Sequence, residues 1–372
     1  MRAWSCNVIE YRNRLVNPRI EEIRVKMTSS RIIKWIFRFA ISGGLIVLLL
    51  MHADLERVGA TVANLDIGWF FIAVAIKGVG ILSGIIRWRL MLLGQDIDLK
   101  LSNLGGAYLI GRFFGSFLPS TIGLDAYRTY YAAVRSREVA KTVAVTVVEK
   151  VIGLLALSFL ALAALPFGLR MLNEKALLLM GIVICGPFVV AAMLLAQPKW
   201  FVRIAEWLKR RGSRFSQAMA RMSEAVARFG TQRGRIGVAI LLGLIIHAAT
   251  SAMYLATAKA VGADIPAAEL LFIGPLMIAA TLVPISIAGI GVREGVYVFF
   301  LTNIGVPTEQ AVLLGFLGFM AGELYSLAGG AVWALTPAAR PEDGYGLTEV
   351  VKRAAAWFKS KQQPGEETQS EL

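Results

Sequence analysis

Apolar runs of bilayer length recur along the chain and constrain its fold more than any other feature. Each is about twenty residues long, which is what a helix needs to cross about 30 Å of hydrocarbon. They lie at residues 32–51, 69–93, 143–166, 176–196, 236–261 and 311–335. Because 56% of the 372 residues are hydrophobic, more than a soluble domain usually carries, the sequence predicts an all-α polytopic membrane protein with about six full transmembrane helices.

Two further apolar stretches, residues 104–123 and 270–295, are broken by proline and glycine. The central proline is Pro119 in the first and Pro284 in the second. A proline removes a backbone donor and clashes with the preceding turn, so a single spanning helix is disfavoured in both stretches. Irregular backbone survives at membrane depth only when it is buried in protein or lines a wet cavity. Glycines would let this backbone turn and approach a ligand: Gly123, Gly289, Gly291 and Gly295.

The charge pattern predicts how the chain crosses the membrane. Residues 198–235 hold ten Lys or Arg against two Glu, within a chain of net charge +14. Basic segments next to spans stay in the cytoplasm. If both broken stretches crossed fully, giving eight full spans, this basic segment would lie outside. If each enters and leaves on one side, the segment and both termini lie inside, so we expect two re-entrant hairpins.

This topology predicts five regions. Residues 1–30 form a basic cytoplasmic extension, 31–197 a first membrane repeat, 198–235 a basic cytoplasmic segment, 236–336 a second membrane repeat and 337–372 a polar cytoplasmic tail. Within 198–235, apolar residues recur at helical spacing and predict an amphipathic helix: Phe215, Met219, Met222, Val226 and Phe229. Such a helix lies on the membrane surface or packs on the protein's own cytoplasmic face, and the pattern leaves both open.

The two broken stretches resemble each other. Residues 116–123 align with residues 281–288, and an arginine follows each proline by nine positions: Arg128 after Pro119 and Arg293 after Pro284. With the expected topology, the two stretches enter from opposite sides. Paired broken segments that meet near the midplane form the substrate site in inverted-repeat transporters, so we expect such a repeat here.

Three motifs resemble the transmembrane, flippase-like region of lysylphosphatidylglycerol synthases and their stand-alone relatives. One runs from Gly111-Arg112-Phe113-Phe114 to Leu118–Gly123 with Asp125 and Arg128. The second is Val148-Glu149-Lys150-Val151-Ile152-Gly153. The third joins Pro284-Ile285-Ser286 to Gly289-Ile290-Gly291-Val292-Arg293-Glu294-Gly295. The resemblance covers about residues 30–336. No soluble aminoacyl-transferase domain follows, so it implies lipid translocation or binding rather than lysine transfer. Departures at Leu124, Lys150 and around Phe319 and Glu323 affect the charges of the site.

Arg128 and Arg293 are the leading candidates for binding a lipid phosphate. A guanidinium grips phosphate in a planar, bidentate way, and charges inside a membrane usually face partners or a cavity. The alternative is structural ion pairing, of Arg128 with Asp125 or Glu149 and of Arg293 with Glu294. Glu149 would either pair with an arginine or carry a proton. The other candidate binding residues are Arg112, Lys150, Ser120, Thr121, Asp125, Ser286 and Glu294, with Lys77, Arg87 and Glu323 as weaker ones.

Residue types needed for catalysis or metal binding are sparse. The two cysteines, Cys6 and Cys185, and the two histidines, His52 and His247, lack ligand spacing. We therefore expect no metal, no cofactor and no enzyme activity. The sequence predicts a flippase or transporter of the inner membrane that binds anionic phospholipid, glycolipid or lipid-linked phosphate headgroups and no nucleic acid. The alternatives are a scaffold for a lipid-modifying enzyme and a membrane-bound lipid transferase.

Overall fold

A computed structural model describes residues 54–116, 122–168, 214–282 and 288–335, with a few isolated positions outside them. Within these residues all regular secondary structure is helical and no strand occurs. The expected spans at 32–51 and 176–196 lie almost wholly outside the described residues. The expected terminal regions, 1–30 and 337–372, lie outside them too.

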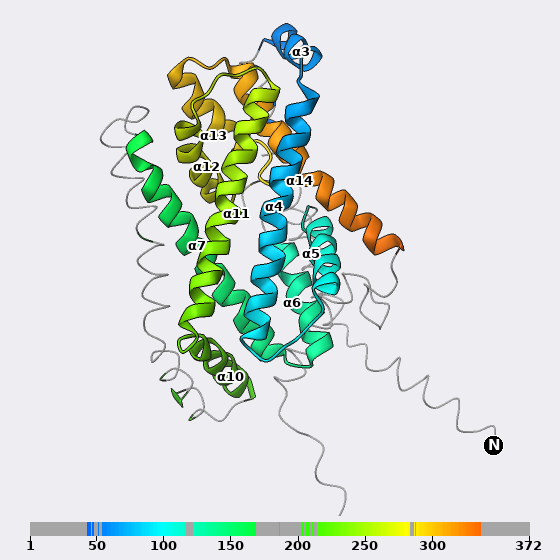
Figure 1. Cartoon of the computed structure of the whole chain (residues 1–372), viewed down its shortest axis with the longest axis vertical. Coiled ribbons are helices and arrows are strands. Elements are labelled where there is room, and N and C mark those ends of the chain that lie inside the picture. Colours follow the sequence, from blue (N-terminus) through cyan, green and yellow to red (C-terminus); the bar gives the residue numbers. More distant parts are fainter. Residues whose placement is uncertain are drawn as a thin grey trace, which may run out of the picture.

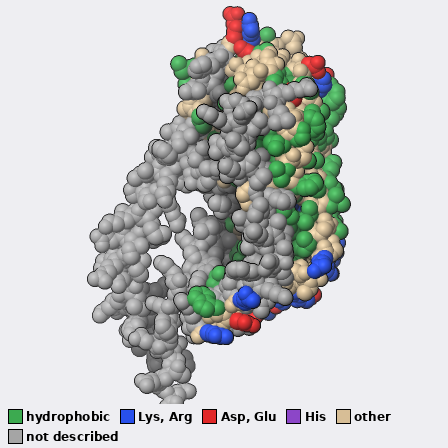
Figure 2. Space-filling model, turned by 90° about the vertical axis from the view of Figure 1, so that its left-hand side faces the viewer, with side chains coloured by type: hydrophobic (Ala, Val, Ile, Leu, Met, Phe, Trp, Pro, Cys, Tyr) green, Lys and Arg blue, Asp and Glu red, His purple; other side chains and the backbone are tan. Residues whose placement is uncertain are grey.

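Four described helices are long and apolar enough to cross a membrane: α4 (Ile67–Leu93), α7 (Val139–Gly168), α11 (Arg233–Ala260) and α14 (Thr308–Leu335). They contain 27, 30, 28 and 28 residues. At about 1.5 Å per residue they exceed the hydrocarbon thickness. On the surface in Figure 2, apolar side chains cover the middle of the visible described region, and charged ones gather at its two ends. These helices confirm an all-α polytopic membrane protein.

The two broken stretches form pairs of short helices. The first pair is α5 (Leu101–Ser116) and α6 (Ile122–Ser136), and the second is α12 (Ala267–Leu282) and α13 (Val292–Leu301). None exceeds 16 residues, about 24 Å, which is too short to cross. The first pair lies in the lower part of the bundle in Figure 1 and the second pair in the upper part. Within each pair the two short helices pack against each other, as a hairpin requires, and whether each pair enters and leaves on one side remains a prediction.

The bend of the second hairpin depends on left-handed backbone. Ala288, Gly289 and Gly291 have φ of 51°, 76° and 85°, a region in which only glycine is relaxed. Gly291 caps α13, and its N–H donates to the Glu294 carboxylate at 2.7 Å. The capping carboxylate fixes where α13 begins.

Gly289→Ala is expected to lower the free energy of unfolding by about 1–2 kcal/mol, because a β-carbon is strained at positive φ. That carbon would also lie 2.8 Å from Cγ2 of Thr281. Gly295, inside α13, would meet nothing within 4 Å if it carried a β-carbon, so Gly295→Ala is the control and should be neutral or stabilising. Thermal unfolding in detergent measures both, and equal effects would contradict a need for glycine at the bend.

The described helices follow the order long, short, short, long twice, as α4–α5–α6–α7 and α11–α12–α13–α14. α4 packs along α11, where Gly80 approaches the Ile246 backbone and Ala249. Each hairpin then packs on the long helix of the other set, α5 on α14 and α12 on α7. The packing of the two sets is thus reciprocal.

The basic segment contains α10 (Arg214–Phe229), which packs against the protein itself. Val226 and Phe229 are buried in one cluster with Met91 and Leu92. The Gln95 side chain donates to the Ala225 carbonyl at 2.8 Å. Of the two readings of the amphipathic pattern, the structure shows the helix packed on the protein's own face.

One short helix, α3 (Leu55–Ala63), lies between two of the predicted spans, in a region for which no helix was predicted. The carboxylate of Asp54 caps it by accepting the N–H groups of Glu56 and Arg57, and the Asp54 N–H donates to Glu309 at 3.1 Å. The cap and this bond to α14 stabilise a helix that is short for a stand-alone element.

Candidate functional site

The two hairpins meet at one cavity of about 360 Å³ between the helices. The first hairpin contributes Arg112 and Ser116 from α5 and Leu124 from α6, and the second contributes Thr281, Ala288 and Arg293. α4, α11 and α14 close the remaining sides with Lys77, His247 and Glu323 among others. The adjoining ends of α5 and α6 and those of α12 and α13 therefore line the same cavity.

Among the described lining residues, three cations surround a single carboxylate. Arg112 donates through Nη2 to the Gly322 carbonyl at 2.9 Å. Glu323 accepts from the Ser116 hydroxyl at 2.6 Å. Lys77 lies 3.5 Å from the Thr250 hydroxyl. Even with Glu294 beside Arg293, the cations outnumber the carboxylates here. An excess of positive charge in a cleft among apolar spanning helices favours an anionic occupant.

Arg293 presents part of its guanidinium to the cavity. Its Nη2 donates to the Ala288 carbonyl at 3.0 Å, and the group lies 4.8 Å from the centre of the Phe319 ring. Its Nη1 is buried and makes no hydrogen bond to the described residues, although Glu294 lies 3.7 Å away as an ion-pair partner. Glu294 therefore offsets part of the Arg293 charge, and the side of the guanidinium that lines the cavity remains the place where an anion could bind.

The apolar part of the cavity wall comes mainly from α11 and α12: Met253, Met277, Ile278 and Leu282. A small hydrophilic anion would gain nothing from this wall. An occupant with a charged head and an apolar body uses both parts.

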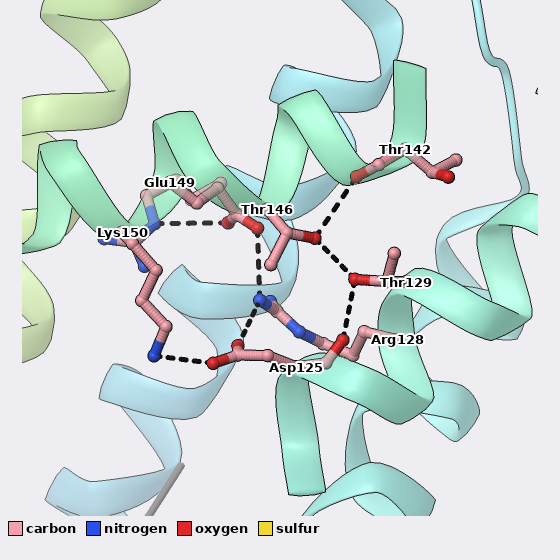
Figure 3. A network of polar contacts seen from close by, with 8 residues as sticks. Asp125, Arg128, Thr129, Thr142, Thr146, Glu149 and Lys150 are labelled. Carbon is pink, nitrogen blue, oxygen red and sulfur yellow. Dashed lines mark hydrogen bonds and ion pairs between the residues drawn. The ribbon is translucent and has the colours of Figure 1, made fainter. Parts of the chain in front are cut away.

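A second polar cluster lies beside the cavity and joins α6 to α7 and α4 (Figure 3). Arg128 Nη2 lies 3.0 Å from Asp125 and 3.1 Å from Glu149. Glu149 is also 3.5 Å from Nε of Arg87, and Asp125 pairs with Lys150 at 2.5 Å. The cluster alternates charges, so most of its members are compensated inside the protein.

Aromatic rings enclose the Arg128 guanidinium, which lies 5.1 Å from the Trp88 ring centre and 5.2 Å from that of Tyr108. Tyr108 also lines the cavity. Arg128 and its partners Asp125 and Glu149 are not among the cavity-lining residues, and neither is Lys150, which pairs with Asp125. Arg128 is therefore in the structural ion pair that was the alternative to phosphate binding. Glu149 pairs with an arginine, which was one of the two roles considered for it.

The remaining predicted residues divide by position. Gly123 is buried in the first turn of α6, and Ser286 is buried outside the cavity lining. Pro119, Ser120, Thr121 and Pro284 lie outside the described residues. Arg112 and Arg293 are the predicted binding residues that line the cavity, and Lys77 and Glu323, which were ranked lower, line it too. Nearby, His247 Nε2 lies 3.1 Å from the Gly153 carbonyl.

Comparison with known proteins agrees with this geometry. The family described as the lysylphosphatidylglycerol synthase TM region matches residues 35–329. The chain belongs to this family. The matched residues include both hairpins and all of the cavity, so the site lies within what defines the family's membrane region. Membership relates this membrane protein to phospholipid metabolism. No curated protein matches the chain at a significant level.

Proposed function

We propose that this protein is a lipid flippase or transporter that binds the anionic headgroup of a membrane lipid in the cavity. The observation that carries the proposal is the cavity at the junction of both hairpins, with three cations around one carboxylate. A phosphate neutralises this excess charge and can pair with the Arg293 guanidinium that lines the cavity. The apolar wall suits the glycerol and upper acyl region of the same lipid.

The arrangement of helices supports movement across the bilayer as well as binding. The two sets of four helices match in order and in reciprocal packing, and their hairpins lie at opposite ends of the bundle. We infer that residues 31–197 and 236–336 are inverted repeats. In such folds the broken helices carry the substrate site near the midplane and alternate their access to the two sides.

Within this proposal the two predicted arginines have different tasks. Arg293 contacts the headgroup, together with Arg112. Arg128 holds the first hairpin against α7 through Glu149 and lies behind Tyr108, one ring away from the cavity. Removing Arg128 would therefore act through the position of α5 and α6.

The charges at the two ends of the bundle support an inner-membrane orientation with the lower end cytoplasmic. The end that carries α10 exposes arginines, including Arg221, Arg228, Arg233 and Arg235. The opposite end, around α3, exposes Asp54, Glu56 and Asp264. The positive-inside tendency then assigns the α10 end to the cytoplasm.

Arg293→Ala is expected to slow lipid movement at least about tenfold, because it removes a charge-assisted hydrogen bond to phosphate. Purified protein is reconstituted in phosphatidylcholine vesicles that contain fluorescent phosphatidylglycerol, and dithionite quenching reports the rate. The control is Arg57→Ala, an arginine whose side chain is 73% exposed on α3. Equal rates for wild type, Arg293→Ala and protein-free vesicles would refute transport.

A further inference from the structure

Lys77 lies in the first half of α4, a helix that contacts α11, α14, α5 and α7. It is ten residues from the start of α4 (77 − 67), about 15 Å along a helix of about 40 Å. α4 packs along α11, and both contribute to the cavity. A charge at this depth is costly and marks a functional group by default.

The surroundings of Lys77 join the two hairpins. Arg112 from the first hairpin, Arg293 from the second and Glu323 from α14 line the same cavity as Lys77. A β-carbon on Gly322 of α14 would lie 3.5 Å from Nη2 of Arg112 and 3.8 Å from Cε of Lys77, so these two cations approach α14 at the same point. Lys77 therefore shares one cavity with a cation from each hairpin.

The three cations differ in how firmly they are held. Arg112 is fixed to the Gly322 carbonyl and Arg293 to the Ala288 carbonyl. Among the described residues, Lys77 makes one long hydrogen bond, to the Thr250 hydroxyl at 3.5 Å. An ammonium on a four-carbon stem is a point charge with three rotatable donors, whereas a guanidinium is a rigid fork. Lys77 can thus follow a moving phosphate that the arginines can bind only in place.

We propose that Lys77 is a shared phosphate ligand that holds the headgroup as it passes between Arg112 and Arg293. This deepens the proposed transport function and rests on it. Without a ligand, three like charges repel one another across the cavity, offset by Glu323 in the lining and by Glu294 beside Arg293. A phosphate at the centre relieves that repulsion for all three at once.

A purely structural lysine would behave differently from a ligand. A charge with one long hydrogen bond contributes little to the folded state and is costly to keep away from water. Lys77→Met keeps the length of the side chain and removes the charge. We therefore expect this variant to unfold at the same or a higher temperature than wild type, while its rate of lipid movement falls at least about tenfold.

The test uses the full-length protein in phosphatidylcholine vesicles containing fluorescent phosphatidylglycerol, with Tm measured on the same preparations. Lys77→Arg, which keeps the charge, should move lipid faster than Lys77→Met. Lys259→Met is the matched control, because this lysine is 42% exposed and pairs with Asp264. It should leave the rate unchanged.

Three outcomes are distinguishable. If Arg293→Ala slows lipid movement but Lys77→Met keeps the wild-type rate, the role of Lys77 is overturned and the transport function stands. If Lys77→Met and Lys77→Gln both lower Tm together with the rate, Lys77 is structural and the proposal also fails. If Arg293→Ala is as fast as wild type, the transport site itself is wrong, and the Lys77 proposal falls with it.

Discussion

Glu149→Ala is expected to lower the free energy of unfolding by about 3–5 kcal/mol, because it leaves buried cations without their counter-charge. The Glu149 side chain is 2% exposed and lies between Arg128, at 3.1 Å, and Arg87, at 3.5 Å. Both guanidiniums would remain in the bundle interior. The first hairpin should loosen from α7, and the measurement is thermal unfolding of the purified protein in detergent.

Glu138→Ala is the control for this prediction. Glu138 directly precedes α7, its side chain is 49% exposed, and it pairs with Lys141 at 3.0 Å. An exposed pair of this kind contributes at most about 1 kcal/mol. If both substitutions had equally small effects, the buried cluster could not be what holds α6 on α7.

Gly329→Ala is expected to destabilise the protein by about 3 kcal/mol, at the upper end for overpacking. A β-carbon at this position of α14 would overlap the carbonyl oxygen of Leu109 on α5. A backbone atom cannot rotate away as a side chain can, so the two helices must separate. Lower Tm and lower yield of folded protein are the readouts, and lipid movement should fall as the first hairpin shifts.

Gly105→Ala is the control for this prediction, because Gly105 lies in α5 with open space around it. It separates the steric effect from the change in helix propensity that any Gly→Ala substitution causes. A β-carbon on Gly105 meets nothing within 4 Å, so the substitution should be neutral or stabilising by up to about 1 kcal/mol. A Gly329→Ala protein as stable as Gly105→Ala would show that α5 and α14 are not packed backbone to backbone.

Most of the described helical framework could be predicted because membrane thickness dictates it. The expected span 69–93 appears as α4 at Ile67–Leu93, and the span 236–261 appears as α11 at Arg233–Ala260. The division of both stretches into short helices could be predicted from Pro119 and Pro284, because a proline interrupts a helix in its own stretch of sequence. α3 was missed because its stability depends on Glu309, which is 255 positions from its bonding partner Asp54.

The site was harder to predict because its chemistry depends on contacts between distant helices. Arg128 and Arg293 lie at the same spacing from a proline. Arg128 is paired with Glu149 away from the cavity lining, whereas Arg293, which has Glu294 beside it, packs on the Phe319 ring and lines the cavity. Spacing along one helix does not reveal which partner the next helix presents. Lys77 and Glu323 were ranked low for the same reason: neither has a charged neighbour in its own stretch of sequence, and the cavity appears only when α4 and α14 are side by side with the hairpins.

The reciprocal packing of α5 on α14 and of α12 on α7 limits which parts can rearrange. Rigid-body rotation of one set of four helices against the other would require few contacts between the two sets. Here each set packs a short helix on a long helix of the other set. Such an interlocked bundle leaves its long helices as a fixed frame. If the protein transports lipid as proposed, the short paired helices, whose adjoining ends line the cavity, are the elements expected to move.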